Sequence, residues 1–458
     1  AGKGHEKTQD YGKRKLFFSD KEEILKSIKL KNRSLSKDLK LNIIKEESKS
    51  KISNKLTLRD ISINSKIIKK NDVFFAIKGK KIDGNKFVCE ALKKKSSLAI
   101  VNKLNKNCLQ SKQVKVGNTL NFLTKCSSIF RENINAKIIS ITGSCGKTSL
   151  KEMIGLTLKK ISRTTYSPKS FNNKYGVPLS LFNLKQNDNF GVFEVGMDKT
   201  GEIDSLTKII KPDLGIITNI SYAHSKNFKS INQIASAKAE IMKNIKENGT
   251  VILNMDDNFY NYHKNFALKK KLKVISFGIK SKYPMIKLIK IKKIKTNYEL
   301  FIKVNGLSVS FYSHNDNESH LYNILATLAS INLFIDIKEL KKDDFLNFKN
   351  PNGRGDVSKV NLKNKKFFLV DESYNSNPLS LKIAIENYDK IVSKNSKKYL
   401  ILGDMLELGK HSVKQHKLIS KIVNKTKIDQ VYVIGKYIKE TFKGLKSDKK
   451  GKILNKKS

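Results

Sequence analysis

Residues 138–148 read Ile138-Ile-Ser-Ile-Thr142-Gly143-Ser144-Cys145-Gly146-Lys147-Thr148, and this stretch decides the fold of the chain. Its apolar start is typical of a buried strand, and residues 149–158 have the apolar spacing of a helix. A strand, a glycine turn and a helix make a phosphate cradle, because glycine lets backbone N–H groups approach an anion and a helix N-terminus adds positive potential. In such a cradle Lys147 can reach the β- and γ-phosphates, and the Thr148 hydroxyl can bind Mg²⁺.

The phosphate-binding pattern is a shortened one. The full G-x-x-x-x-G-K-[ST] pattern requires glycine at the position of Ile141, so the match is to T-G-x-x-G-K-T over residues 142–148. An ordinary strand-to-helix turn with a chance Gly and Lys is the alternative, and the flanking strand and helix favour phosphate binding. This phosphate loop comprises Gly143, Ser144, Cys145, Gly146, Lys147 and Thr148.

The composition is strongly basic, with 92 Lys plus Arg against 41 Asp plus Glu and a formal net charge of +51. Such a charge ordinarily points to a nucleic-acid partner. Here the excess is almost all lysine and is spread over the whole chain, whereas arginine is the usual residue for bidentate recognition of phosphates and bases. We therefore interpret the charge as a lysine-rich codon bias and expect no nucleic-acid partner.

The cysteines and the apolar runs indicate the cellular compartment in which the protein works. Cys89, Cys108, Cys126 and Cys145 form no C-x-x-C pair, which predicts neither a zinc site nor a disulfide framework. No run of 18 apolar residues occurs, so no membrane insertion is expected. The charged N-terminus is unlike a signal peptide. These features together predict a cytoplasmic protein.

The chain length of 458 residues suits about three domains. Residues 31–55 are rich in Lys, Ser and Asn and have weak periodicity, which predicts a linker. Residues 56–135 have the pattern of a small α/β unit. From residue 136 to about 335 strands alternate with helices, as in a parallel sheet. A third α/β unit is expected over residues 336–458, with strands at 367–370, 399–402 and 430–434.

Polar side chains follow the expected central strands, and ligands of such sheets bind beyond the carboxyl ends of the strands. Glu194, Asn219, His224 and Asp256 all lie at or just after such ends. A carboxylate after an apolar strand, together with the threonine of a phosphate loop, favours Glu194 as a Mg²⁺ ligand over a surface carboxylate. His224 alone is more often a hydrogen-bonded loop histidine.

Three further polar positions have an ordinary interpretation as well as a functional one. Lys238 on a helix is usually a solvated lysine, and Asp371 with residues 375–378 can be a plain turn. Arg354 stands out because the chain has few arginines. A guanidinium between domains can stabilise charge on a transferring phosphoryl group.

Taken together, the motifs resemble those of the Mur ligases and keep the order of that family over about residues 56–440. They are Thr142–Thr148, Lys151-Glu152-Met153, Asn172-Asn173 with Gly176-Val177-Pro178, Glu194 through Met197, Gly201-Glu202-Ile203, Thr218-Asn219-Ile220 with His224, Ala237 through Glu240, His320 through Asn323, Gly353-Arg354-Gly355, Asp371 through Pro378, and Gly403 through Gly409. Residues 172–178 and 403–409 are most similar to the branch that adds D-alanyl-D-alanine to UDP-MurNAc-tripeptide.

The resemblance implies an α/β protein with the three-domain Mur ligase architecture. A UDP-sugar-binding domain would span residues 56–135, and a central ATP-binding domain with a mostly parallel sheet would span 136–335. A Rossmann-like ligase domain, expected to be incomplete, would span 336–458. The implied reaction is ATP-dependent amide-bond formation in cytoplasmic peptidoglycan precursor synthesis, with ATP and Mg²⁺ as cofactors and an acyl phosphate as intermediate.

The same resemblance implies roles for single residues. Catalytic roles fall on Lys147, Lys238 (carbamylated in the family), His224 and Arg354. Magnesium binding falls on Thr148, Glu194, His224 and Lys238. ATP binding falls on the phosphate loop and on Asn323, Arg354 and Asp371. Substrate binding falls on Ser65, Asn172, Asn173, Asn375, Asn377 and Pro378, with residues 64–66 and 78–84 in the UDP-sugar region.

Residues 1–30 resemble a different branch. Ala1-Gly-Lys-Gly-His-Glu6 and Phe18-Ser-Asp20 are similar to the C-terminal end of the diaminopimelate-adding, MurE-type ligases. This implies fusion to, or action beside, a MurE-type ligase, and it favours diaminopimelate as the third residue of the peptide.

Two alternatives stay open. One is another amide ligase of the superfamily, such as a folylpolyglutamate synthetase, against which residues 172–178 and 404–409 argue. The other is a basic nucleic-acid-dependent NTPase, whose ATP turnover would be stimulated by DNA or RNA and would depend steeply on salt.

Overall fold

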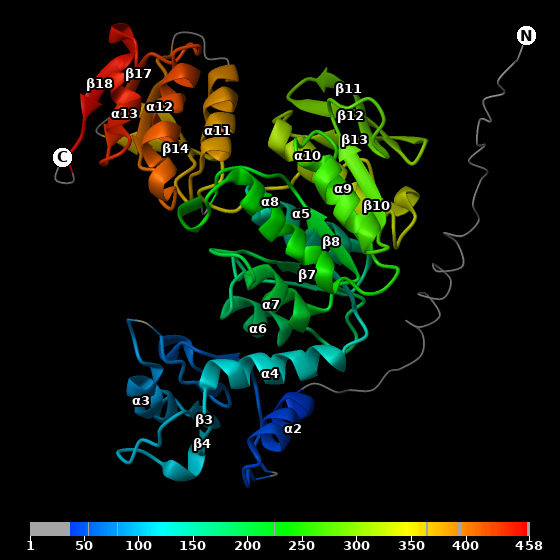
Figure 1. Cartoon of the computed structure of the whole chain (residues 1–458), viewed down its shortest axis with the longest axis vertical. Helices are drawn as coiled ribbons and strands as arrows, with labels where there is room; N and C mark the ends of the chain where they lie inside the picture. Colours follow the sequence, from blue (N-terminus) through cyan, green and yellow to red (C-terminus); the bar gives the residue numbers. More distant parts are fainter. Residues whose placement is uncertain are drawn as a thin grey trace, which may run out of the picture.

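The computed structural model describes residues 37–53, 55–79, 81–223, 225–362, 365–391 and 396–455. Figure 1 shows three lobes, with the central lobe (residues 137–348, green to yellow) between the N-terminal lobe (residues 37–132, blue to cyan) and the C-terminal lobe (residues 353–455, yellow-orange to red). The MurE-like remnant predicted at residues 1–30 lies outside the described residues. Within the described part of the chain, no helix has the length and apolar character that crossing a bilayer requires.

The N-terminal lobe is a four-stranded sheet in the order β1-β2-β3-β4, and every strand pair in it is parallel. Apolar side chains of β2 and β3 are buried on both faces, as expected for strands of a parallel sheet. The elements are α2 (Lys37–Ser48), β1 (Ile61–Ser62), β2 (Val73–Phe75), α3 (Val88–Lys93), β3 (Leu98–Val101), β4 (Gln113–Lys115) and α4 (Thr119–Glu132).

The structure differs from the linker predicted over residues 31–55. Residues 37–48 form helix α2, in which Leu41, Ile43 and Ile44 are buried, and α2 packs against α4. The apolar residues of α2 do not repeat with a clear helical period. This helix is therefore stabilised by its packing against α4 more than by its own sequence pattern.

The prediction of no disulfide is also contradicted. Cys89 in α3 and Cys108 in the loop after β3 form a disulfide, with their Cα atoms 5.4 Å apart. The two residues are 19 positions apart and lack any motif spacing. Only the packing of that loop against α3 brings the two sulfur atoms together.

The central lobe contains a nine-stranded sheet in the order β13-β12-β11-β10-β9-β8-β5-β7-β6. The strands from β6 to β11 pair in parallel, and β11, β12 and β13 form an antiparallel meander at one edge. The strands are β5 (Lys137–Thr142), β6 (Thr164–Tyr166), β7 (Phe190–Glu194), β8 (Leu214–Ile217), β9 (Thr250–Asn254), β10 (Lys273–Gly278), β11 (Ile286–Ile294), β12 (Asn297–Val304) and β13 (Leu307–Ser313).

Helices cover both faces of this sheet, which makes the predicted α/β class correct. Helices α5 and α10 cover one face; α5 packs on β5, and α10 packs on α5 and on β9, β10 and β11, in one core that includes Ile139 and Ile141. Helices of the other face share a core with Ile138, the β5 neighbour that points to the opposite side. The helices are α5 (Lys147–Ile161), α6 (Gly176–Leu181), α7 (Glu202–Ile210), α8 (Ile231–Ala239), α9 (Tyr260–Lys269) and α10 (Glu318–Ile331).

The C-terminal lobe has two small sheets. All three strands predicted there exist, but β15 pairs with β14 in an antiparallel hairpin, whereas β16, β17 and β18 form a parallel sheet. The elements are β14 (Asp356–Leu362), β15 (Lys365–Asp371), α11 (Pro378–Lys390), β16 (Tyr399–Gly403), α12 (Ser412–Val423), β17 (Gln430–Ile434), α13 (Lys439–Lys443) and β18 (Lys450–Ile453).

Candidate active site

The phosphate loop joins β5 to α5 at the carboxyl end of the central sheet. Gly143 has a φ of +147°, and a Cβ atom there would lie 1.8 Å from Oγ1 of Thr218. Gly146 has a φ of +80° and is the N-cap residue of α5. Both positions require glycine, the first for space and the second for its left-handed backbone. The open N-terminus of α5 therefore faces the loop, as anion binding requires.

The segment after β8 holds the loop in shape. The backbone N–H of Ser144 donates to the carbonyl of Asn219 at 2.9 Å, and the N–H of Cys145 donates to the Asn219 side chain at 2.9 Å. Thr218 Oγ1 donates to the carbonyl of Cys145 at 2.6 Å, and Ser144 Oγ donates to the carbonyl of Ser221 at 3.0 Å. Asn219, which the sequence analysis placed at a strand end and in a family motif without a role of its own, therefore positions the loop.

Two lysines converge on one carbonyl of the loop. Lys147 Nζ donates to the carbonyl of Gly143 at 2.8 Å, and Lys238 Nζ from α8 donates to the same oxygen at 2.9 Å. Lys238 is 2% exposed. Burial lowers the pKa of Lys238 well below the ordinary lysine value, and the neighbouring charge of Lys147 lowers it further. The structure therefore favours a neutral amine at Lys238.

The acid predicted as a metal ligand lies beside the loop. Glu194, at the end of β7, is 1% exposed. Its Oε2 accepts a hydrogen bond from Thr148 Oγ1 at 2.7 Å, and its Oε1 accepts one from Asn172 Nδ2 at 2.7 Å. The structure thus brings together two of the predicted magnesium ligands. His224 lies outside the described residues.

The donor atoms suit magnesium. A hydroxyl and a carboxylate are hard oxygen ligands, and Mg²⁺ commonly uses one or two protein carboxylates together with substrate phosphates and water. Over the residues that the structure describes, no group of three or more His, Cys, Asp or Glu side chains is placed to hold a metal ion. The pair formed by Thr148 and Glu194 fits an ion that is shared with a bound nucleotide.

The C-terminal lobe reaches this site through Arg354. Its Nη2 donates to Ser170 Oγ at 3.4 Å, and Ser170 Oγ lies 3.3 Å from Thr148 Oγ1. The guanidinium also stacks on the ring of Tyr374, 4.5 Å from the centroid. Ser170 is therefore the single residue that separates this cation from the loop threonine in space.

Asn377 is a second contact from the C-terminal lobe. It is the N-cap residue of α11, with Pro378 at the first helical position, and its Oδ1 accepts from the backbone N–H of Ser380 at 3.1 Å. The same oxygen accepts from Cys145 Sγ at 3.2 Å and from Ser221 Oγ at 3.4 Å. Burial raises the pKa of the Cys145 thiol, which keeps this S–H a donor toward Asn377.

Other predicted site residues form hydrogen bonds away from the phosphate loop. Ser65 Oγ donates to Glu90 of α3, whereas Asn173 accepts from the N–H groups of residues 175 and 176 in its own turn. Asn375 accepts from the N–H of residue 376. Hydrogen bonds from Ser373 lower the pKa of Asp371. Of the remaining residues, Asn323 is close to the loop, with its Oδ1 3.5 Å from the point where a Cβ of Gly146 would lie.

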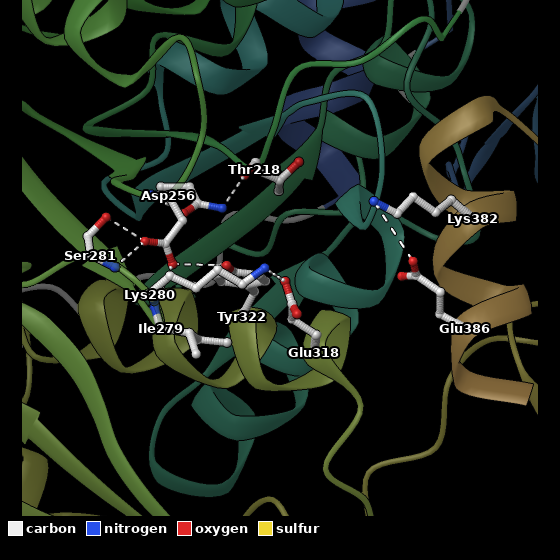
Figure 2. A network of polar contacts seen from close by, with 10 residues as sticks. Thr218, Asp256, Ile279, Lys280, Ser281, Glu318, Tyr322, Lys382 and Glu386 are labelled. Atoms are coloured by element: carbon white, nitrogen blue, oxygen red, sulfur yellow. Dashed lines mark hydrogen bonds and ion pairs between the residues drawn. The ribbon is translucent and has the colours of Figure 1, made fainter. Parts of the chain in front are cut away.

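Two connections at this edge of the sheet were not predicted. Ser170 joins Thr148 to Arg354, and no motif marks it. Asp256, noted only as a strand-end residue, is the centre of a polar network with Ser281 and Tyr322 (Figure 2). Its Oδ2 accepts from Tyr322 Oη at 2.9 Å, and residues 255–258, 260, 261, 280 and 281 line an open pocket of about 480 Å³ beside it. The position of Asp256 just after a buried strand was the sequence signal that could have indicated this network.

Comparison with known proteins agrees with this geometry. The model of the Mur ligase middle domain matches residues 141–331. The UDP-N-acetylmuramoyl-tripeptide–D-alanyl-D-alanine ligase of Buchnera aphidicola subsp. Baizongia pistaciae (strain Bp) is 33% identical over 439 residues, which cover 88% of this chain and 90% of the relative.

Two solved structures are similar over most of their length. MurF from Acinetobacter baumannii has a TM-score of 0.80 at 24% identity, covering 90% of this chain and 89% of that one, and shows the shared fold. MurF ligase from Thermotoga maritima in complex with ADP has a TM-score of 0.73 at 26% identity, covering 89% and 90%. The chain is a member of the Mur ligase family, among the UDP-N-acetylmuramoyl-tripeptide–D-alanyl-D-alanine ligases.

Proposed function

We propose that this protein joins D-alanyl-D-alanine to UDP-N-acetylmuramoyl-tripeptide with hydrolysis of ATP to ADP and phosphate. The observation that carries the proposal is the likeness to the Buchnera ligase, 33% identity over 88% of the chain. The site agrees with it, because a glycine loop, Lys147 and the Thr148–Glu194 pair meet at one sheet edge. ATP use is further supported by the ADP complex of the Thermotoga relative.

Nucleotide binding would use the phosphate loop. An incoming phosphate competes for Lys147, whose ammonium now bonds the carbonyl of Gly143. Magnesium would be held by Thr148 and Glu194, with His224 and a carbamylated Lys238 as further ligands, and it would supply positive charge at the transferred phosphoryl group. Carbamylation requires a neutral amine, and the lowered pKa of Lys238 supports it. Asn323, close to the loop, and Asp371, at the end of β15, are proposed nucleotide contacts.

The reaction divides into two steps. A carboxylate oxygen of the tripeptide bonds to the γ-phosphorus as ADP leaves, because a free carboxylate is a poor electrophile. The dipeptide amine then attacks the acyl carbon, loses a proton and expels phosphate. Arg354, one residue from the loop threonine through Ser170, would stabilise charge on the transferring group.

The substrates are assigned to the two flanks of the loop. Asn172 and Asn173 would face the tripeptide, and residues 375–378 the dipeptide; the contact between Asn377 and Cys145 supports the second assignment. Closure of the lobes around these groups would exclude water that hydrolyses the acyl phosphate.

The UDP-sugar end is assigned to a pocket of about 390 Å³ where the N-terminal lobe meets the central lobe. Two lysines in its wall suit a diphosphate. Ser65 lies in the same lobe but is engaged with Glu90. The pocket is lined by Lys78, Gly79, Asn102, Asn118, Thr119, Leu120, Lys174 and Tyr175. Because its substrates are ATP and a nucleotide sugar, we place the protein in the cytoplasm.

The deciding experiment is phosphate release from ATP by the purified full chain with Mg²⁺. We expect turnover only when UDP-MurNAc-tripeptide and D-Ala-D-Ala are both present. Turnover without either peptide substrate, stimulated instead by DNA or RNA and suppressed by salt, would favour the nucleic-acid-dependent NTPase. Turnover with folate and glutamate would favour the folylpolyglutamate alternative. Comparing the diaminopimelate and lysine tripeptides tests the identity of the third residue.

A further inference from the structure

Lys151 is a fully buried lysine to which the proposed reaction assigns no role. It lies on α5, one turn after Lys147, and its side chain is 0% exposed. Its Nζ donates to the carbonyl of Ser167 at 2.5 Å, to the carbonyl of Lys169 at 2.7 Å and to Oε1 of Glu152 at 2.7 Å. An ammonium has three N–H donors, so each of them has a partner here.

The two carbonyls belong to the loop between β6 and α6, residues 167–175. Lys169 has a left-handed backbone with a φ of +47°, which is unfavourable for a residue other than glycine. The hydrogen bond to the carbonyl of Ser167 is buried, and a buried carbonyl that loses its donor costs free energy. Lys151 therefore holds the start of this loop in a conformation that the loop does not favour by itself.

The far side of the same loop contacts the candidate active site. Asn172 Nδ2 donates to Glu194 Oε1 at 2.7 Å, and the carbonyl of Asn172 accepts from the N–H of Gly196 at 2.8 Å. Ser170 Oγ lies 3.3 Å from Thr148 Oγ1 and accepts from Arg354. The loop thus connects Lys151 on one side to the acid and the threonine on the other.

We propose that Lys151 is a positioning residue for the metal and nucleotide site. By pulling the carbonyls of residues 167 and 169 toward α5, it sets the place from which Asn172 orients the Glu194 carboxylate. The inference rests on the proposed function, because Glu194 acts there as a ligand shared with the nucleotide. Lys151 itself touches no substrate in this scheme.

The ordinary alternative is a lysine that contributes to stability alone, through its ion pair with Glu152. The two readings differ in what the loss of Lys151 does to magnesium use. If Lys151 is purely structural, its loss lowers the melting temperature and leaves the magnesium requirement of the folded protein unchanged. If Lys151 is a positioning residue, its loss raises that requirement, because the carboxylate of Glu194 is no longer held toward Thr148.

The test compares Lys151→Met with Lys159→Met in the full chain. Lys159 is a matched control, since it lies on the same helix and over the same Tyr166 ring, 4.6 Å from the centroid against 5.7 Å for Lys151, but is exposed. The readouts are the MgCl₂ concentration for half-maximal ATP turnover and the calorimetric affinity for ADP at fixed low and high MgCl₂. Groups that orient a metal ligand typically contribute about 10-fold to 100-fold in metal affinity.

We expect Lys151→Met to need about 10-fold to 100-fold more MgCl₂, and to bind ADP weakly at low MgCl₂ and nearly normally at high MgCl₂. Lys159→Met should behave as wild type. An unchanged magnesium requirement in a folded Lys151→Met protein overturns the proposal. If that variant does not fold, Lys151→Gln, which keeps one amide donor for the loop, replaces it under the same criterion.

A double-mutant cycle with Asn172→Ala tests the route of the effect. If Lys151 acts through Asn172, the double variant has the same magnesium requirement as Asn172→Ala alone, because Lys151 has no further effect once Asn172 is removed. Fully additive shifts contradict the proposed route. Wild-type protein that consumes no ATP with both peptide substrates rejects the proposed function instead, whereas the calorimetric ADP readout still tests Lys151.

Discussion

At the scale of single residues, the most unusual group is the Lys238 amine. It shares the carbonyl of Gly143 with Lys147, and its burial favours the neutral form. A buried cation next to another cation is unfavourable, so this position is suited to a lysine that reacts to become an anion. Carbamylation would replace the repulsion between two lysine cations by an attraction between the anionic Lys238 and the cationic Lys147.

Lys238→Ala should therefore abolish most turnover, by about a hundredfold to a thousandfold, because a charge that supports the metal site is lost. Formate or another small carboxylic acid should restore part of it by occupying the space of the carbamate. Phosphate release measured with increasing formate checks this. The control is Lys243→Ala, which changes an exposed lysine in the turn that follows α8. An Ala variant insensitive to every small acid would contradict the carbamate.

At the scale of elements, Asp256 connects the end of β9 to the loop after β10 and to α10. Burial raises the pKa of its carboxyl, but hydrogen bonds from Ser281 and from the backbone of residues 279 and 280 outweigh this and lower it to about 2. Tyr322 Oη donates to the same carboxylate (Figure 2). One ionised side chain thus joins three neighbouring elements.

Asp256→Asn should lower the free energy of unfolding by about 1–2 kcal/mol at neutral pH. The folded pKa lies below the unfolded one, so this stabilisation is present above about pH 4 and is lost as the pH falls toward 2. The gap in urea-unfolding stability between wild type and variant should therefore close on acidification. Asp448→Asn, on an exposed turn, is the control, and a gap independent of pH would argue against the ionised network.

At the scale of the whole molecule, a loop of the C-terminal lobe is held against the central lobe. The N–H of Lys226 donates to the carbonyl of Glu407 at 2.7 Å, and Ser225 Oγ donates to the carbonyl of Leu408 at 3.4 Å. Gly409 lies so close that an added Cβ would be 2.9 Å from the Cα of Lys226. The same central segment follows Ser221, which touches the phosphate loop, so the docking of the lobes and the site are joined.

Gly409→Ala should reduce the rate of ligation roughly tenfold to a hundredfold, because the lobes can no longer approach correctly. Its affinity for ADP should fall less than the rate of ligation, since the phosphate loop, which would bind the phosphates of ADP, is on the central lobe. Gly306→Ala is the matched control: its φ is +88°, also left-handed like the +54° of Gly409, but nothing lies within 4 Å of its Cβ position. Steady-state rates and calorimetry check this, and equal losses in both variants would rule out an effect of docking.

Much of the fold could be predicted because the information is local. The alternation of buried apolar strands with helices, the glycine turn at residues 143–146 and the Thr148 hydroxyl at the helix start all depend on neighbours a few residues away. The same holds for Glu194 as a strand-end acid. Helix α2 was mistaken for a linker because its apolar residues lack a clear period, and its order depends on tertiary packing such as that against α4.

By itself, then, the sequence determined the strand–loop–helix cradle and the class of fold, since backbone conformation and side-chain period are short-range properties. Only the tertiary structure decided which groups meet there. Glu194 reaches Thr148 because β7 is the neighbour of β5 in the sheet, and Cys145 reaches Asn377 across 232 residues. The disulfide of Cys89 and Cys108 has the same origin. The order of strands in the sheet, the docking of the lobes and the packing of a loop on a helix set these three contacts, and none of them produces a periodic pattern in the sequence.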